Sequence, residues 1–397
     1  MTGGNMIGNE KLLSKAAITS GSFAQRIGLA TEDVNRFIDY IVDASFLKNN
    51  ARVERMRGNT KKLVRLGIGE EVLRPGNYGS SGDGFSDVST SAVTLTSKAM
   101  KAVVPIADDA LMDNIEGESF ADHLMRVVAN QIGNQLEYAY LMGQDTGALP
   151  KNHIWEMVEG WYPRAISEGH VIDAKTVFTD RDISAEKLSR TLKTLSSKYR
   201  GKRENLRFIM SDDLYQDYVD ALGSRTTPLG DDAITGDSLM SFGKVTISPC
   251  ALVPTNLPVP VSGGGNTTLS SASVAGDTTI EVASATNVQQ GDTLAIGEGA
   301  TREIRKVASV VATDVTLDSA LVFPHQSGDK VVECTLDGTF VMLCDTSNLV
   351  LGIQQDVTIE TERRATEGVT YFVVTIRCDC ALENPDAVVV LSNLKVK

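Results

Sequence analysis

The chain has 397 residues, which suggests two or three domains rather than a single core. Its 38 basic and 51 acidic side chains give a net charge of −13, which argues against tight, phosphate-driven binding of nucleic acid, because that affinity comes from clustered Lys and Arg. With 42% hydrophobic and 22% charged residues the composition is that of a folded protein, and no apolar run approaches the roughly 18–20 residues that span a bilayer, so we expect no membrane association.

The N-terminal part, residues 1–59, is predicted to be an arm with short helices. Thr31-Glu32-Asp33 is typical of a helix start, with acidic residues in the first turn. Apolar residues follow at helical spacing from Val34 to Val42. This helix is small for a domain, so we expect it to cover another part of the molecule.

Residues 60–105 are predicted to form a long two-stranded excursion. Strand-like patterns at 61–69 and 92–96 flank a Gly/Ser-rich segment at 74–84, which predicts a flexible tip. Two strands alone are marginal in water, so the excursion must lie on something else, and a neighbouring subunit is the natural candidate. Basic residues lie at the start of this region and again near its end: Arg52, Arg55, Arg57, Lys61, Lys62, Lys98 and Lys101.

An acidic patch containing Asp108, Asp109 and Asp113 leads into the most regular helical pattern of the chain, Ser119–Met142. Apolar residues repeat there with a period of 3.6, and Ser119 can cap the first turn. The helix would be about 36 Å long at 1.5 Å per residue. It is predicted to be the spine of a domain over residues 106–182.

Residues 183–261 are predicted to be an α+β unit. Ser184 and Ser211 each precede an amphipathic helical pattern, and Leu206–Met210 between them is strand-like. Lys244–Ile247 is predicted to continue the same sheet.

The composition changes near residue 261 and predicts an inserted all-β module at 262–332. Ser262–Gly265 is typical of a flexible linker, and only short strand-like runs follow it. Residues 333–397 are predicted to return to the main body, with a hairpin over Val357–Arg377 and a last strand over Ala387–Leu391. The expected core of the module consists of Ile280, Val282, Leu294, Ile296, Val307 and Leu317.

No constellation of residues predicts chemistry. Cys378 and Cys380 would share one face of a strand, but two sulfur ligands do not close a tetrahedral zinc site, so we favour buried, reduced thiols. The glycines of 76–84 are not followed by the Gly-Lys-Ser/Thr of a phosphate loop. None of the four His pairs with another His or Cys at metal-ligand spacing. We therefore expect no catalytic, metal-binding or cofactor-binding residue, and no cofactor.

Taken together, the order of segments resembles the Hong Kong 97-type major capsid protein of tailed bacteriophages. The resemblance rests on the arm, the excursion at 60–105, the acidic turn at 107–113, the spine helix and the α+β unit with its closing hairpin. It implies an α+β fold with an N-terminal arm, an extended loop, a peripheral domain built on the spine helix and an axial domain. The module at 262–332 lies outside the resemblance.

The resemblance implies a function: self-assembly, through hexamers and pentamers, into an icosahedral head that encloses double-stranded DNA without reading its sequence. Implied partners are a separate scaffolding protein, a portal and, as a further candidate, decoration proteins. The protein would be assembled in the bacterial host cytoplasm and reside in the virion. Two alternatives stay open, namely an enzyme with an accessory β domain, such as a carbohydrate-active one, and the shell of a nanocompartment.

The charged segments are candidate contacts between subunits. Basic residues of 48–65 and acidic residues of 108–118 could meet across a subunit boundary and fix its register. The alternative, that both are solvated faces of one chain, is equally open. The candidate residues are Arg52, Arg55, Arg57, Lys61, Lys62, Lys98, Lys101, Asp108, Asp109 and Asp113.

Overall fold

The computed structural model describes residues 51–68, 88–107, 118–147, 151, 153–223, 241–364, 366 and 369–397. The helices predicted before residue 51, the tip of the excursion and the acidic residues Asp108, Asp109 and Asp113 lie outside the described residues.

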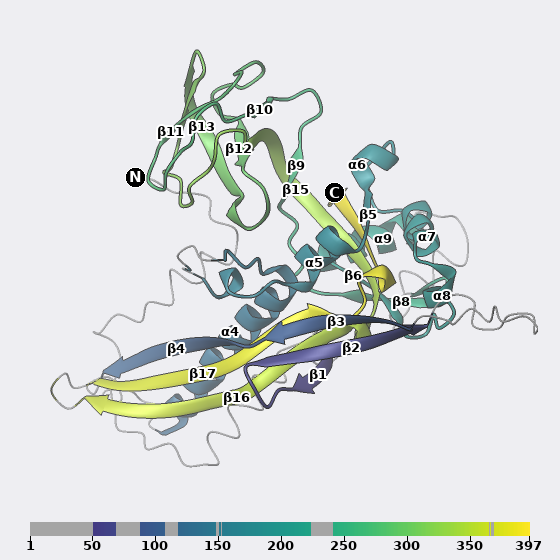
Figure 1. Cartoon of the computed structure of the whole chain (residues 1–397), viewed down its shortest axis with the longest axis vertical. Helices are drawn as coiled ribbons and strands as arrows, with labels where there is room; N and C mark the ends of the chain where they lie inside the picture. The colour runs from purple at the N-terminus through teal and green to yellow at the C-terminus, as the bar shows by residue number, and fades with distance from the viewer. Residues whose placement is uncertain are drawn as a thin grey trace, which may run out of the picture.

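One layer of the fold is a four-stranded sheet with a long helix across one face (Figure 1). The helix, α4 (Glu118–Met142), confirms the predicted spine to within one residue. Tyr140 of this helix and Ile376 of the sheet belong to the same buried core. The strands lie in the order β1 (Arg52–Arg55), β16 (Leu349–Arg364), β17 (Val369–Leu382) and β4 (Lys98–Ala107).

The excursion is shorter than the sequence predicts. Strands β2 (Thr60–Ile68) and β3 (Val88–Thr96) form an antiparallel hairpin, as expected. The next strand, β4, pairs with β17 of the four-stranded sheet instead of continuing the hairpin. Alternation of apolar residues predicts a strand but does not identify its partner, so the sequence could not separate β4 from the excursion.

A second layer is a mixed sheet whose two faces belong to different cores. Side chains alternate along β15 (Lys330–Asp345). Val341 and Leu343 therefore face helices α7 (Ala185–Thr194) and α9 (Asp212–Gly223), whereas Phe340 and Met342 face α4 and α5 (Trp161–Glu168). The strand order is β5 (His170–Asp173), β18 (Val388–Lys395), β15 (Lys330–Asp345), β6 (Leu206–Met210), β8 (Val245–Pro249) and β7 (Ser241–Phe242).

Two helices of this unit, α7 and α9, begin where the capping residues predict. The Ser184 hydroxyl accepts a hydrogen bond from the backbone of Lys187, and Ser211 does the same for Leu214. The helices are α5 (Trp161–Glu168), α6 (Ala174–Val177), α7 (Ala185–Thr194), α8 (Ser197–Arg200) and α9 (Asp212–Gly223), with 3-10 turns η1 (Ile154–Glu156), η2 (Gly299–Thr301), η3 (Thr346–Asn348) and η4 (Pro385–Ala387).

Residues 262–332 form a β structure with its own core, drawn at the top of Figure 1. All six residues expected in that core lie in one buried cluster: Ile280, Val282, Leu294, Ile296, Val307 and Leu317. The strands are β10 (Asn266–Thr268), β11 (Thr279–Glu281), β12 (Thr293–Ile296), β13 (Glu303–Val311) and β14 (Asp314–Leu317).

The entry to the module is not the flexible linker that its glycines predict. The Val261 amide donates to the carbonyl of Glu333, and the Gly265 amide donates to the Glu333 carboxylate, both at 2.8 Å. Composition predicted flexibility here, but it carries no information about a hydrogen-bond partner 68 residues further on. The exit from the module is also held by hydrogen bonds. Strand β15 runs from the module into the body (Figure 1), and between the two it pairs with β9 (Leu257–Pro260).

Candidate assembly surface

Two of the predicted contact residues form ion pairs within the chain at the start of the hairpin. Arg52 lies 2.6 Å from the Glu383 carboxylate and 3.3 Å from that of Glu54. Lys61 of β2 donates to Glu54 at 2.7 Å and to the Arg55 carbonyl at 3.0 Å. The hydrogen bond from Lys61 lowers the pKa of Glu54. These pairs bind the hairpin to β1 and to the loop that carries Glu383.

Lys98 forms a third internal pair, where the chain leaves the base of the same hairpin. Its ammonium group lies 2.6 Å from the carboxylate of Asp145, which follows the spine helix. Lys151 donates to the same carboxylate. Burial raises the pKa of Asp145, but the hydrogen bonds from Lys151 and Lys98 outweigh it and lower that pKa to about 2. Asp145 is therefore ionised throughout the neutral range and joins α4 to β4.

The other predicted contact residues are placed on the surface or not described. Arg55, Arg57, Lys62 and Lys101 are exposed, while Asp108, Asp109 and Asp113 lie outside the described residues. Among the residues that the structure does describe, the basic segment is bound to Glu54 and Glu383, two acids that the sequence analysis did not single out. Contact between the basic and acidic segments across subunits stays a prediction.

Sequence reasoning missed Asp379, which fixes the hairpin to the sheet. Its carboxylate is almost fully buried and accepts hydrogen bonds from the backbone of Thr96 at 2.6 Å and of Cys380 at 2.9 Å. Burial raises the pKa of this carboxyl group. The position of an acid between two inward-facing thiols was the available signal, because a strand interior rarely holds an acid without a hydrogen-bonding role.

The base of the hairpin is also packed against its own chain. Leu95 is fully buried in a small cluster with Met56, Val350 and Ala381, on the face of the sheet opposite the spine helix. Further out on the same hairpin, Val64 is 61% exposed. The hairpin therefore has a rigid, buried base and an apolar side chain exposed beyond it.

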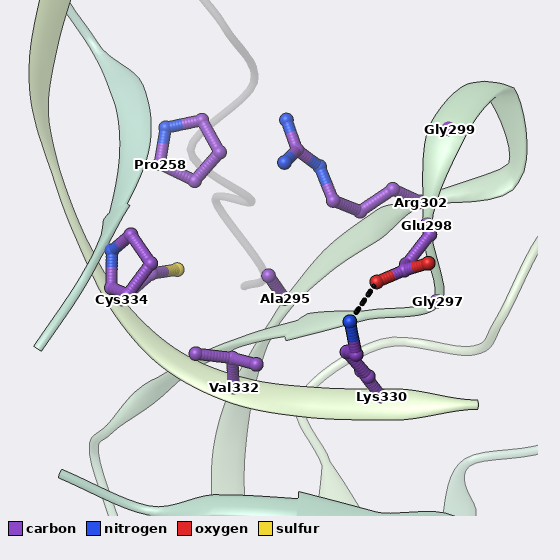
Figure 2. A pocket seen from close by; sticks show the side chains of 10 residues that line it. Pro258, Ala295, Gly297, Glu298, Gly299, Arg302, Lys330, Val332 and Cys334 are labelled. Carbon is purple, nitrogen blue, oxygen red and sulfur yellow. Dashed lines mark ion pairs between the residues drawn. The ribbon is translucent and has the colours of Figure 1, made fainter. Parts of the chain in front are cut away.

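A pocket of about 290 Å³ lies where the module meets the body (Figure 2). Pro258 and Cys334 form part of its wall, and Lys330 pairs with Glu298 at its rim at 2.7 Å. Burial raises the pKa of the Cys334 thiol to about 11, so the thiol is protonated at neutral pH and is a poor nucleophile. The pocket offers no pair of groups arranged for acid–base or nucleophilic chemistry.

The five cysteines agree with the reading of buried, reduced thiols. All are free and buried, and burial raises the pKa of Cys250 to about 11 and of Cys344 to about 12. In the described part of the chain, no three His, Cys, Asp or Glu side chains lie close enough to hold a metal ion. Within the same residues, no helix is long and apolar enough to cross a membrane.

Known proteins resemble this chain in sequence and in fold. No protein-family model matches the sequence. A putative prophage capsid protein of Bacillus subtilis (strain 168) is 26% identical over 237 residues, which are 59% of this chain and 73% of that protein. A chain from the procapsid of satellite phage P4, a structure that includes the size determination (Sid) protein, superimposes with a TM-score of 0.54 over 98% of this chain and 99% of its own, at 10% identity.

A chain from the capsid of a native GTA particle gives a TM-score of 0.50 at 10% identity, and the match covers 94% of this chain and 93% of the other. The chain has the Hong Kong 97-type capsid fold. The resemblance and the α+β class predicted from the sequence are thereby confirmed. The sequence similarity to a prophage capsid protein and the shared fold support a structural role in a shell over an enzymatic one, and neither alternative function is favoured. The domain boundaries predicted from the sequence remain predictions.

Proposed function

We propose that this protein is the major subunit of a phage head, assembling through hexamers and pentamers into a closed icosahedral shell around double-stranded DNA. The hairpin β2–β3 carries the proposal. A two-stranded ribbon is marginal by itself, yet Asp379, Leu95 and the Lys61–Glu54 pair hold its base firmly in place. A firmly held ribbon that exposes apolar surface is suited to lie on a neighbouring copy.

The remaining partners follow from this role. A separate scaffolding protein would guide closure, a portal would occupy one vertex, and decoration proteins are a further candidate. DNA would be enclosed without sequence readout, because a chain of net charge −13 offers little general attraction for phosphates. Assembly would take place in the bacterial cytoplasm and the finished subunit would belong to the virion.

Electron microscopy of the expressed chain, alone and with the products of neighbouring genes, tests the proposal. Closed shells built from rings of six and five are the expected result, with sedimentation giving megadalton particles. A variant lacking 70–86 is the comparison, since it keeps strands β2 and β3 and removes only chain between them. Recovery of only monomers or dimers under every co-expression condition would refute the proposal.

A further inference from the structure

A strongly basic surface lies at one end of the mixed sheet. Between residues 190 and 205 the chain has six Lys or Arg and a single acid, Glu204, although its net charge is −13. All but one of the six are exposed, Arg200 being half-buried. Lys202, Arg203 and Lys244 surround a hollow of about 510 Å³. We call the following set the basic surface: Lys198, Arg200, Lys202, Arg203 and Lys244.

The topology brings these residues together. Strands β6 and β8 are parallel neighbours, and the basic residues precede the first residue of each, Leu206 and Val245. Arg203 also donates a hydrogen bond to the Gly243 carbonyl at 3.1 Å, which joins the two loops. Among the described residues, no carboxylate forms an ion pair with any member of the basic surface. Nothing in the described fold of one subunit therefore accounts for the gathering of charge.

The same unit carries a surface of opposite sign on helix α9. Leu214 and Tyr218 of this helix are buried, and the outer side holds Asp212, Asp213, Asp217 and Asp220, which we call the acidic face. The helix contains no basic residue. Acids in its first turn are favoured by the helix dipole, but Asp220 lies towards the carboxyl end, where the dipole opposes an anion. The helix dipole therefore does not account for all four acids of the acidic face.

No ion pair joins the two surfaces within the described part of one subunit. The basic surface lies at the amino ends of β6 and β8, whereas α9 begins after the carboxyl end of β6, about 16 Å away along a five-residue strand. Opposite charges that do not pair with each other within a subunit can pair between copies placed head to tail. Such heterologous contacts close into a ring when the rotation between copies permits.

We propose that the basic surface of each copy binds the acidic face of α9 on the next copy around a ring. The inference rests on the proposed assembly into hexamers and pentamers. A second copy fits better than DNA, because its acidic face is present in equal number and because a chain of net charge −13 offers little general attraction for phosphates. Repetition around the ring adds up contacts that are individually weak and salt-sensitive.

Charge reversal tests the contact. The variant Lys198→Glu/Lys202→Glu/Lys244→Glu leaves two cations and three new carboxylates on the basic surface, so that two negative surfaces lie opposite each other. The variant Asp212→Lys/Asp213→Lys/Asp220→Lys leaves only Asp217 beside three lysines, so that two positive surfaces lie opposite each other. Each is expected to lower the yield of rings and shells by about tenfold or more, because juxtaposed like charges oppose association. Sedimentation at low salt measures the yield. Lys306→Glu, at an exposed position in the module, is the control and should assemble like the wild type.

Mixing the two variants separates a lost contact from a folding defect. Copies that alternate around a six-membered ring bring opposite charges together at every boundary, so an equimolar mixture should regain hexamers. The chain carrying all six substitutions should regain both hexamers and pentamers, because its reversed charges match at every boundary.

Normal assembly by both reversed variants would overturn this inference while leaving the wild-type shells, and so the proposed function, intact. A wild type that forms no shells would instead refute the proposed function. Assembly that is lost and regained neither in the mixture nor in the sixfold variant would also overturn the contact. Shells of Lys198→Glu/Lys202→Glu/Lys244→Glu that form normally but retain less DNA would assign the basic surface to phosphates.

Discussion

Replacing Asp145 by Asn should destabilise the subunit at neutral pH and not at pH 2. Asp145 accepts hydrogen bonds from Lys98, from Lys151 and, at 2.9 Å, from the backbone of Gly147. It joins the end of the spine helix to the first residue of β4. The amide of Asn keeps the shape of the side chain and removes the charge that both lysines need.

The magnitude follows from the lowered pKa. A fall from 3.8 to about 2 corresponds to about 2.5 kcal/mol at roughly 1.4 kcal/mol per pH unit. The Asp145 side chain is 27% exposed, so solvent screening reduces this to about 1–2 kcal/mol. Because the pKa is lower in the folded state, the stabilisation is present above pH 4 and is lost as the pH falls towards 2.

Urea unfolding of dissociated subunits from pH 7 to pH 2 would measure the effect. The free energy of unfolding of Asp145→Asn should fall below that of the wild type at pH 7, and the two should converge near pH 2. Asp314→Asn, at an exposed position in β14, is a matched control with little expected effect. A loss of stability that is as large at pH 2 as at pH 7 would show that charge is not its cause.

Three further outcomes are expected. Deleting residues 70–86 should leave the circular dichroism spectrum and the stability of the subunit nearly unchanged, since the hairpin base around Leu95 stays intact. The same deletion should abolish or weaken shells, and unchanged assembly in sedimentation would contradict this. If the basic and acidic segments meet across subunits, molar salt should loosen shells, although each exposed ion pair contributes only about 0–1 kcal/mol. Shells that are equally stable at low and high salt would count against this contact. Replacing 262–332 by a short Gly-Ser linker should change the free energy of unfolding of the body by no more than about 1–2 kcal/mol, because the linker has only to join Pro260 to Cys334, which already lie opposite each other in β9 and β15. A shortened chain that fails to refold from urea would refute this prediction.

Local patterns identified the elements well. The spine helix, the capping by Ser184 and Ser211, and the strand Leu206–Met210 depend on periodicity and on side chains within a few residues. The core of the module followed in the same way, because alternation in short strands shows which side chains point inward.

Partners distant in sequence were beyond prediction. The pattern of β4 does not say that it pairs with β17, and the glycines of 262–265 do not reveal that Glu333 holds them. The partners of the candidate contact residues could not be predicted for the same reason, since Arg52 pairs with Glu383, which is 331 residues away. The place of Asp379 between two inward-facing thiols signals a hydrogen-bonding role, but no local pattern identifies the backbone of Thr96 as its partner.

Strand β15 explains how a separate β module can be carried without loosening the shell protein. Its first residues pair with β10 and β12 of the module, its middle pairs with β9, and its last residues lie between β18 and β6. A flexible tether would let the module turn freely, whereas a hydrogen-bonded strand of 16 residues holds it in a defined direction. A force or a partner acting on the module is therefore transmitted along β15 to Phe340 and Val341, which lie in the two cores of the body.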